Sequence, residues 1–182
     1  ERSVPSFALG IGVSSRGADH LRSRPALDLL NLPKEVMENH YGFEVSNEYK
    51  EYKTKGKMIG WQEALYAIAD ATGICKTLSA FFTPHLFVFR DFARMVREVT
   101  GIKIIEEEIK DIGRRIVTLE RLFNVRECAS REDDYLPERF YTEPTTAGPK
   151  INRGQVIDRD KYEMMLDEYY EYQGLDKKGN PK

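Results

Sequence analysis

The chain has 182 residues, of which 41% are hydrophobic, enough to bury the core of one domain or of two small domains that share it. Its 28 basic and 30 acidic residues nearly cancel, without a long run of one sign, which excludes the charge pattern typical of a nucleic-acid-binding protein. Because no apolar run approaches the roughly 20 residues that span a membrane, we expect no membrane partner.

The two cysteines, Cys75 and Cys128, form neither a CxxC pair nor a disulfide framework. Disulfides are rare in reducing compartments, and the chain shows no charged-then-apolar leader. We therefore expect a reduced, cytoplasmic protein.

The start of the chain is predicted to be irregular. Residues 1–17 are rich in Gly and Ser, which favours an extended segment or loop whose backbone approaches another group closely. Gly10 and Gly12 are only weakly similar to a phosphate loop, because no strand–helix unit with a longer glycine pattern surrounds them. Residues 18–25 bring ionisable groups of different kinds together, which is most often a solvated helix start.

Proline positions divide the next part of the chain, where Pro25 and Pro33 separate short helical pieces. Residues 47–71 then favour a helix, although Gly56 and Gly60 each weaken it by about 1 kcal/mol relative to Ala. The expected buried face of this helix carries Trp61, Leu65 and Ile68.

Three further helices are predicted downstream, after a break at residues 81–84. The first covers residues 86–99, and the clearest covers residues 104–123, with acidic residues in its first turn. Residues 128–157 are polar and irregular, and residues 159–172 form a last helix that Gly174 ends. One apolar stripe of the clearest helix comprises Ile105, Ile109, Ile112, Ile116, Leu119 and Phe123. Since strands and helices do not alternate, the fold class is all-α.

A short stretch at the end of the 47–71 helix holds a carboxylate, a glycine and a thiol, Asp70, Gly73 and Cys75. Taken alone, a free cysteine is most often a buried, small hydrophobic residue that packs a helix end. The motifs elsewhere in the chain favour a second interpretation.

Five stretches, in order, resemble the C-terminal half of tungsten-containing aldehyde ferredoxin oxidoreductases. Residues 15–21 are similar to that family's Arg-Gly-x-x-His segment, and residues 70–75 to its Asp-x-x-Gly-Leu-Cys. Residues 112–127 resemble its long Gly-x-Arg-Ile-x-x-Leu-Glu-Arg-x-Phe-Asn-x-Arg helix. Residues 133–140 and 169–174 match two more segments. The resemblance implies that residues 1–182 form the multihelical, cofactor-contacting C-terminal domain of such an enzyme.

The chain departs from the family pattern at three single positions and in lacking some of the family's segments. Ile74 stands where Leu is usual, Leu175 where Trp is common, and Cys128 where Gly is frequent. The family's N-terminal cofactor-binding parts, with three closely spaced cluster cysteines, have no counterpart here. We therefore expect the isolated chain to retain neither cofactor and to be inactive.

The resemblance implies a tungsten (or molybdenum) bis-pterin cofactor beside a [4Fe–4S] cluster. Asp70 would accept hydrogen bonds from pterin N–H groups, since a carboxylate offers two acceptor oxygens. Gly73 would allow close approach of the backbone, and Cys75 would be the fourth cluster ligand as a thiolate. The alternatives are a solvated helix-end carboxylate for Asp70 and a buried neutral thiol for Cys75.

The remaining site residues follow from the same resemblance. Arg16 would contact the pterin or its phosphate, with Gly17 allowing the turn, and Ile74 and Lys76 would flank the cluster ligand. His20 is the candidate for catalytic proton transfer, because its side chain titrates near neutral pH. Arg16 as a surface residue and His20 as a helix-start residue are the alternatives.

The implied activity is oxidation of a small aldehyde to a carboxylic acid, with electrons passed through the cluster to ferredoxin. One alternative keeps these cofactors and acts on another substrate, such as an aromatic acyl thioester. A second alternative is a non-enzymatic helical interaction module. Three cysteines with C-x-x-C-x-x-x-C spacing upstream would favour the enzyme.

Overall fold

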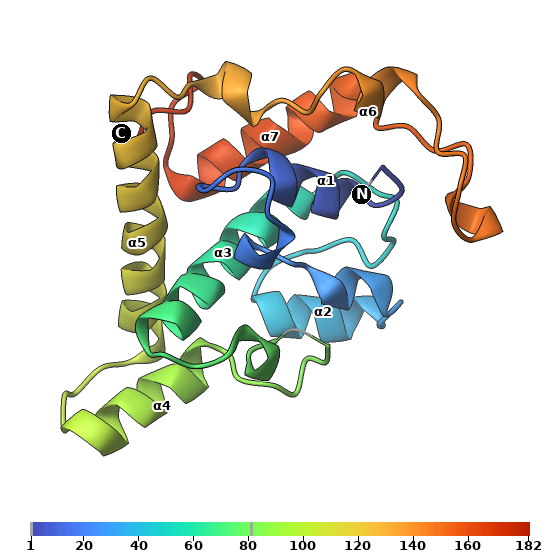
Figure 1. Ribbon diagram of the computed structural model, residues 1–182. Helices are drawn as coiled ribbons and strands as arrows, with labels where there is room; N and C mark the ends of the chain where they lie inside the picture. The colour runs from blue at the N-terminus through green and yellow to red at the C-terminus, as the bar shows by residue number, and fades with distance from the viewer. Residues whose placement is uncertain (1, 81) are drawn as a thin grey trace.

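Helix α3 (Lys55–Ala71) lies at the centre of the fold, and four other helices pack against it. The structure, a computed structural model, describes residues 2–80 and 82–182. The surrounding helices are α1 (Pro5–Gly12), α4 (Phe89–Thr100), α5 (Glu106–Arg126) and α7 (Arg159–Gln173). Shorter helices are α2 (Lys34–Tyr41) and α6 (Arg139–Thr142), with 3-10 turns η1 (His20–Arg22), η2 (Ala26–Leu29), η3 (Lys76–Leu78), η4 (Arg131–Asp134) and η5 (Lys150–Asn152). Figure 1 shows α5 along one side of the molecule, with α4 near its lower end.

The all-α class is confirmed, because the described residues contain isolated β-bridges and no strand. The buried face predicted for the central helix is also confirmed: Trp61, Leu65 and Ile68 are each at most 3% exposed. The last helix ends as predicted, with Gly174 in the left-handed conformation at φ 73°. Across the described residues, no helix combines the length and the apolar character that a membrane crossing requires.

The prediction of an extended segment or loop for residues 1–17 is wrong over α1. Pro5 begins this helix, where its missing N–H is no loss, and residues 5–10 are buried. Gly12 serves close packing, since a Cβ there would lie 2.6 Å from the carbonyl oxygen of Asp134. The glycines therefore let α1 approach its neighbours and do not form a phosphate loop.

The 47–71 helix begins later than predicted, at Lys55. Thr54 adopts the left-handed conformation at φ 70°, which a helix cannot continue through. Gly56 does not mark a weak point, because a Cβ there would meet the backbone of Met165 in α7. At the predicted break, Phe81 lies outside the described residues, and residues 82–86 are not helical.

The apolar stripe predicted for residues 104–123 is only partly buried. Ile109 is 2% exposed, whereas Leu119 and Phe123 are 67% and 56% exposed. The reason is Gly113, which has no Cβ and lets α5 approach the backbone of Ala64 in α3. The buried line of α5 consequently consists of Ile109, Gly113 and Val117.

Candidate functional site

Three segments that are far apart in the sequence meet at the guanidinium of Arg22. Its Nη1 donates to Oδ2 of Asp70 at 3.0 Å, at the end of α3. Its Nη2 donates to both carboxylate oxygens of Glu120 on α5, at 2.7 and 2.5 Å. The Arg22 side chain is 10% exposed, so these charge-assisted bonds are shielded from water on one side. The prediction of a solvated helix start for residues 18–25 is therefore wrong at Arg22.

Local hydrogen bonds hold this loop in place. The carboxylate of Asp19 accepts from the N–H of Leu21 at 2.7 Å and caps η1. The Ser15 hydroxyl donates to Glu120 at 2.6 Å, and the side-chain amide of Asn124 donates to the carbonyl oxygen of Ser15 at 2.7 Å. The loop is thus attached to one face of α5 at two successive turns.

The end of α3 presents Asp70 to the same cluster. Gly73 adopts φ 71°, and the N–H of Ile74 donates back to the carbonyl oxygen of Ala69 at 2.9 Å. This turn brings Nζ of Lys76 to 2.9 Å from Oδ2 of Asp70. Both cations contact Oδ2, and the Asp70 side chain is 45% exposed, so Oδ1 is the oxygen available to an outside donor.

Cys75 is exposed, which excludes the buried packing role. Its Sγ lies 3.0 Å from Oγ1 of Thr77, and hydrogen bonds from Thr77 lower the pKa of the thiol. A lower pKa favours the thiolate, the form that binds metals. Among the described residues, no group of three or more His, Cys, Asp or Glu side chains could hold a metal ion. The exposure of Cys75 and the lowered pKa of its thiol fit the metal-ligand role predicted for it.

Arg16, Gly17 and His20 lie on the exposed part of the loop that Glu120 anchors. Arg16 pairs with Asp19 and is 54% exposed. Gly17 adopts φ 89° with open space around the missing Cβ. His20 is exposed, with Nε2 3.4 Å from Nη1 of Arg24.

The side chains at this site carry chemical groups that suit one side of a cofactor-binding site. An exposed thiol, a half-exposed carboxylate oxygen and an exposed guanidinium offer a metal ligand, a hydrogen-bond acceptor and an anion partner. Ile74 fits least well, because its N–H is already donated to Ala69.

Sequence reasoning missed Arg22 as the centre of the cluster, and it did not assign a role to Glu120. Glu120 and Asn124 both stand in the motif at residues 112–127, which was a usable signal. For Arg22 no signal existed beyond its charge, because its partners are brought together only by the packing of α3 against α5.

A buried carboxyl group lies behind this cluster. Glu63 on α3 is 5% exposed and accepts hydrogen bonds from the hydroxyl of Tyr169 at 2.6 Å and the amide of Gln173 at 3.2 Å. Burial raises the pKa of Glu63 to about 8, so the group is neutral near pH 7.

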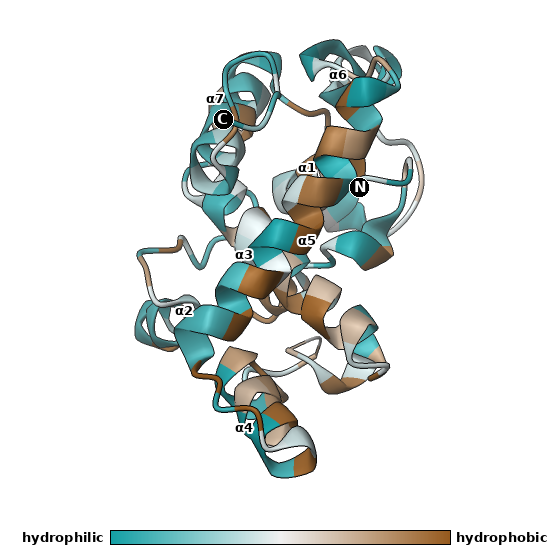
Figure 2. Ribbon diagram, turned by 90° about the vertical axis from the view of Figure 1, so that its left-hand side faces the viewer, coloured by the Kyte–Doolittle hydropathy of each residue, from teal (hydrophilic) through white to brown (hydrophobic). Residues whose placement is uncertain are grey.

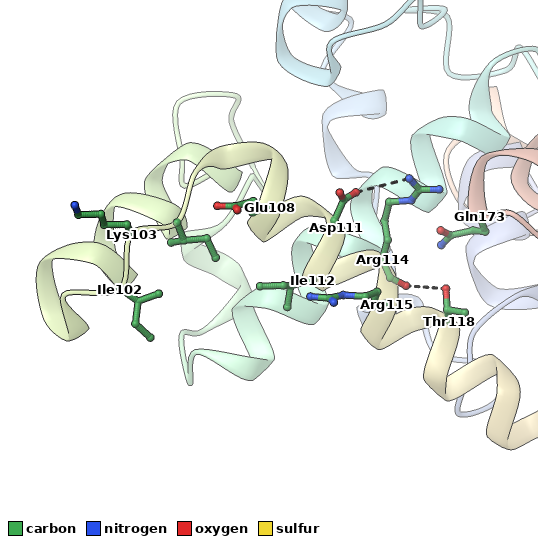
Figure 3. Close-up of a pocket in the computed structure, with 10 residues that line it drawn as sticks. Ile102, Lys103, Glu108, Asp111, Ile112, Arg114, Arg115, Thr118 and Gln173 are labelled. Atoms are coloured by element: carbon green, nitrogen blue, oxygen red, sulfur yellow. Dashed lines mark hydrogen bonds and ion pairs between the residues drawn. The ribbon is translucent and has the colours of Figure 1, made fainter.

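A groove of about 620 Å³ lies along α5, and its lining residues are shown in Figure 3. Asp111 and Arg114 form an ion pair of 3.9 Å beside it, and the hydroxyl of Thr118 donates to the carbonyl oxygen of Arg114 at 2.9 Å. None of the seven residues predicted as site residues lines this groove.

Comparison with known proteins gives matches over the whole chain. Residues 1–182 match the family model described as aldehyde ferredoxin oxidoreductase, domains 2 and 3. The tungsten-containing aldehyde ferredoxin oxidoreductase of Thermococcus kodakarensis is 30% identical over 180 residues, which are 98% of this chain and 26% of that protein. The Pyrococcus horikoshii protein of the same name is 29% identical, with the same coverage. The chain thus spans about a quarter of the length of these relatives.

Among solved structures, a similar fold is found in a chain of the active site complex BamBC of benzoyl coenzyme A reductase in complex with 1,5-dienoyl-CoA. The TM-score is 0.58 at 25% identity, and the match covers 74% of this chain and 18% of that chain.

Proposed function

This chain belongs to the aldehyde ferredoxin oxidoreductase family, matching its domains 2 and 3, and on that basis we propose that it forms one wall of a tungsten or molybdenum bis-pterin site with an adjacent [4Fe–4S] cluster. The enzyme that contains it would oxidise a small aldehyde to a carboxylic acid and pass electrons to ferredoxin. The observation that carries this proposal is the convergence of Asp70, Arg22 and Glu120 beside the exposed Cys75.

Asp70 is the proposed acceptor for the pterin N–H groups. Arg22 and Lys76 both contact Oδ2 and would fix the carboxylate in position, while Oδ1 accepts from the cofactor. Arg16 and Gly17 would lie against the pterin or its phosphate, because a guanidinium pairs well with phosphate and the glycine leaves space for close approach. Ile74 would contribute packing and Lys76 its charge.

Cys75 is the proposed fourth ligand of the cluster, since a [4Fe–4S] cluster is held by four cysteine thiolates. The other three would come from the part of the enzyme outside this chain. Thr77 would stabilise the thiolate by its hydrogen bond to Sγ. When bound, the metal cofactor would carry the redox step, in which aldehyde and water yield the acid, one electron pair and a matching pair of protons.

His20 is the proposed proton carrier. Its side chain is exposed on the loop that Arg16 and Gly17 share, and an imidazole nitrogen can both accept and donate a proton. His20 would take up a proton released during oxidation and pass it to water.

A second candidate substrate class is an aromatic acyl thioester, because the similar structure is a benzoyl coenzyme A reductase complex. This second function has the same proposed cofactor site. It differs in the substrate that the remaining domains would admit.

Metal analysis and assays on the full-length protein test the proposal. We expect tungsten or molybdenum together with iron, and dye reduction that depends on aldehyde. Dienoyl-thioester oxidation without aldehyde activity would favour the second candidate. A folded full-length protein without either metal would contradict both.

A further inference from the structure

The buried carboxyl of Glu63 has no part in the proposed mechanism, although it lies behind the site. Its Oε2 accepts hydrogen bonds from two neutral groups of α7, the hydroxyl of Tyr169 and the amide of Gln173. In the described part of the chain, Glu63 forms no ion pair. A buried carboxylate without a paired cation is unfavourable, so these surroundings favour the protonated acid.

Glu63 shares a face of α3 with Asp70, the proposed pterin acceptor. The two residues are seven positions apart, almost two helical turns, which places them about 10 Å apart along one side of the helix. Figure 2 shows α5 crossing over α3 on this side of the molecule. Gly113 of α5 lies against the backbone of Ala64, the residue next to Glu63. The buried carboxyl is therefore beside the junction of α3 and α5 that forms the site.

Two charged members of the site act on Glu63. Burial raises its pKa to about 8, the hydrogen bonds from α7 lower it, and of the two charges Arg22 of η1 lowers it and Glu120 of α5 raises it. Arg22 is thus the cation toward which an ionised Glu63 is attracted.

The guanidinium of Arg22 has one donor to offer such a carboxylate. Nη1 donates to Asp70 and Nη2 to Glu120, while Nε forms no hydrogen bond with a described residue. Oε1 of Glu63 likewise accepts no hydrogen bond from the described residues. An ionised Glu63 is consequently a third carboxylate that competes for one guanidinium.

The charges of the site balance when Glu63 is protonated. Arg22 and Lys76 carry two positive charges, which equal the two negative charges of Asp70 and Glu120 in their ion pairs. Ionisation of Glu63 adds a third negative charge at a buried position. The titration of this carboxyl therefore changes how strongly the guanidinium holds its other partners.

We propose that Glu63 is a positioning residue that acts through Arg22. Its protonated form leaves the guanidinium to Asp70 and Glu120, and its ionised form draws the guanidinium away from Asp70. The inference rests on the proposed function in one respect, which is that Asp70 holds the pterin. Retention of the pterin should then weaken as the pH rises through the pKa of Glu63, about 8.

Infrared titration of the full-length protein tests the competition for Arg22 without an activity assay. The carbonyl band of a protonated acid at Glu63 is missing from Glu63→Gln, so the difference between the two proteins isolates it. We expect this band at pH 7 and its loss by pH 9. In Asp70→Asn the guanidinium has one carboxylate fewer, so the band should disappear about one pH unit lower. A band that is absent at pH 7, or an unchanged midpoint in Asp70→Asn, would overturn the proposal.

The rate of pterin loss on gel filtration measures the consequence for the site. From pH 7 to pH 9 the protonated fraction of a group with a pKa of about 8 falls about tenfold, so the wild type should lose pterin about tenfold faster at pH 9. Glu63→Gln, which does not ionise, should lose pterin equally slowly at both pH values. A Gln variant that keeps the wild-type pH dependence, or a wild type without one, would overturn the positioning role.

Glu168 provides the matched control, because it is a half-buried carboxyl of α7 that accepts from the backbone N–H groups of Thr54 and Gly56. Glu168→Gln should keep the wild-type pH dependence. The two proposals fail separately. A full-length protein that holds no pterin at any pH would disprove the proposed function, and the infrared midpoint of Asp70→Asn would still decide whether Glu63 competes for the guanidinium. Pterin that is retained independently of Glu63 would disprove this inference alone.

Discussion

Arg22 and Glu120 are separated by 98 residues in the sequence, and Nη2 of the arginine lies 2.7 and 2.5 Å from the two carboxylate oxygens of the glutamate. Arg22 also reaches Asp70, so the loop after α1, the end of α3 and the middle of α5 have fixed relative positions. This arrangement would keep the proposed pterin acceptor in place before any cofactor binds.

Replacing Arg22 tests that arrangement. Arg22→Met should destabilise the fold by about 2–3 kcal/mol, because two carboxylates lose a charge-assisted partner. In the full-length enzyme it should also lower the retained pterin. Arg126→Met is the control, since that guanidinium is 70% exposed and, among the described residues, forms its ion pair with the neighbouring Glu127 and lies over the Phe123 ring on its own helix. Thermal unfolding and pterin analysis measure both effects; equal behaviour of the two variants would contradict the assignment.

The buried Glu63 predicts a pH dependence of stability. Its pKa is raised by burial to about 8 from an unfolded-state value near 4.3. A carboxyl with a raised pKa contributes stability that is fully present below the unfolded value and is lost as the pH rises through the folded value. The free energy of unfolding should therefore fall between about pH 4.3 and pH 8, by at most about 1.4 kcal/mol per pH unit.

Glu63→Gln should remove this dependence while keeping an acceptor for Tyr169 and Gln173. Denaturant titrations at pH 5 and pH 8 measure the difference for both proteins. A wild-type protein whose stability falls no more than that of the Gln variant would show that the carboxyl is ionised in the folded state.

The close packing at Gly113 predicts that a larger residue at this position lowers the free energy of unfolding. A Cβ at this position would lie 2.4 Å from the nearest atom, the carbonyl oxygen of Ala64, and the backbone of α3 would have to move. Gly113→Ala should cost about 1–3 kcal/mol, despite the higher helix propensity of Ala. As a control, Asp111→Ala on the exposed side of α5 should change the free energy of unfolding little. Thermal unfolding compares the two; a stabilised Gly113→Ala variant would contradict the close approach of the helices.

His20 carries the proton-transfer prediction. In the full-length enzyme, His20→Ala should lower turnover by roughly 10²–10⁴-fold with tungsten and iron content unchanged. His20→Gln should be nearly as damaged, because the amide forms hydrogen bonds and does not titrate. Normal turnover of either variant with cofactors present would remove His20 from the mechanism.

Much of the helical fold was predictable because apolar periodicity reports buried faces directly. Trp61, Leu65 and Ile68 are buried as their spacing predicts. Two of the errors share a cause, which is that glycine has two uses. The prediction placed Gly12 in a loop and gave Gly113 no role, and in the structure both permit close contact between helices. Spacing within one helix does not reveal that contact.

Residues that lie close in the sequence could be placed together in advance, as with Asp70 and Lys76, whose side chains pair at 2.9 Å. Arg22 could not be placed in advance, because a charged residue in a charged stretch is usually solvated, and its burial comes from the packing of η1 against α1 and α3 beside Glu120 of α5. The roles of the predicted site residues came from the resemblance and remain predictions, those of Asp70, Cys75 and Lys76 included.

The central claim is that Cys75 ligates the cluster, and the two cysteines of the chain provide a matched pair because both are exposed. The direct measurement is the iron content and the low-temperature electron paramagnetic resonance of the reduced full-length enzyme. Cys75→Ser should lose or alter the [4Fe–4S] signal and stop ferredoxin reduction, while Cys128→Ser should match the wild type. A cluster signal that survives Cys75→Ser and disappears in Cys128→Ser would contradict this account.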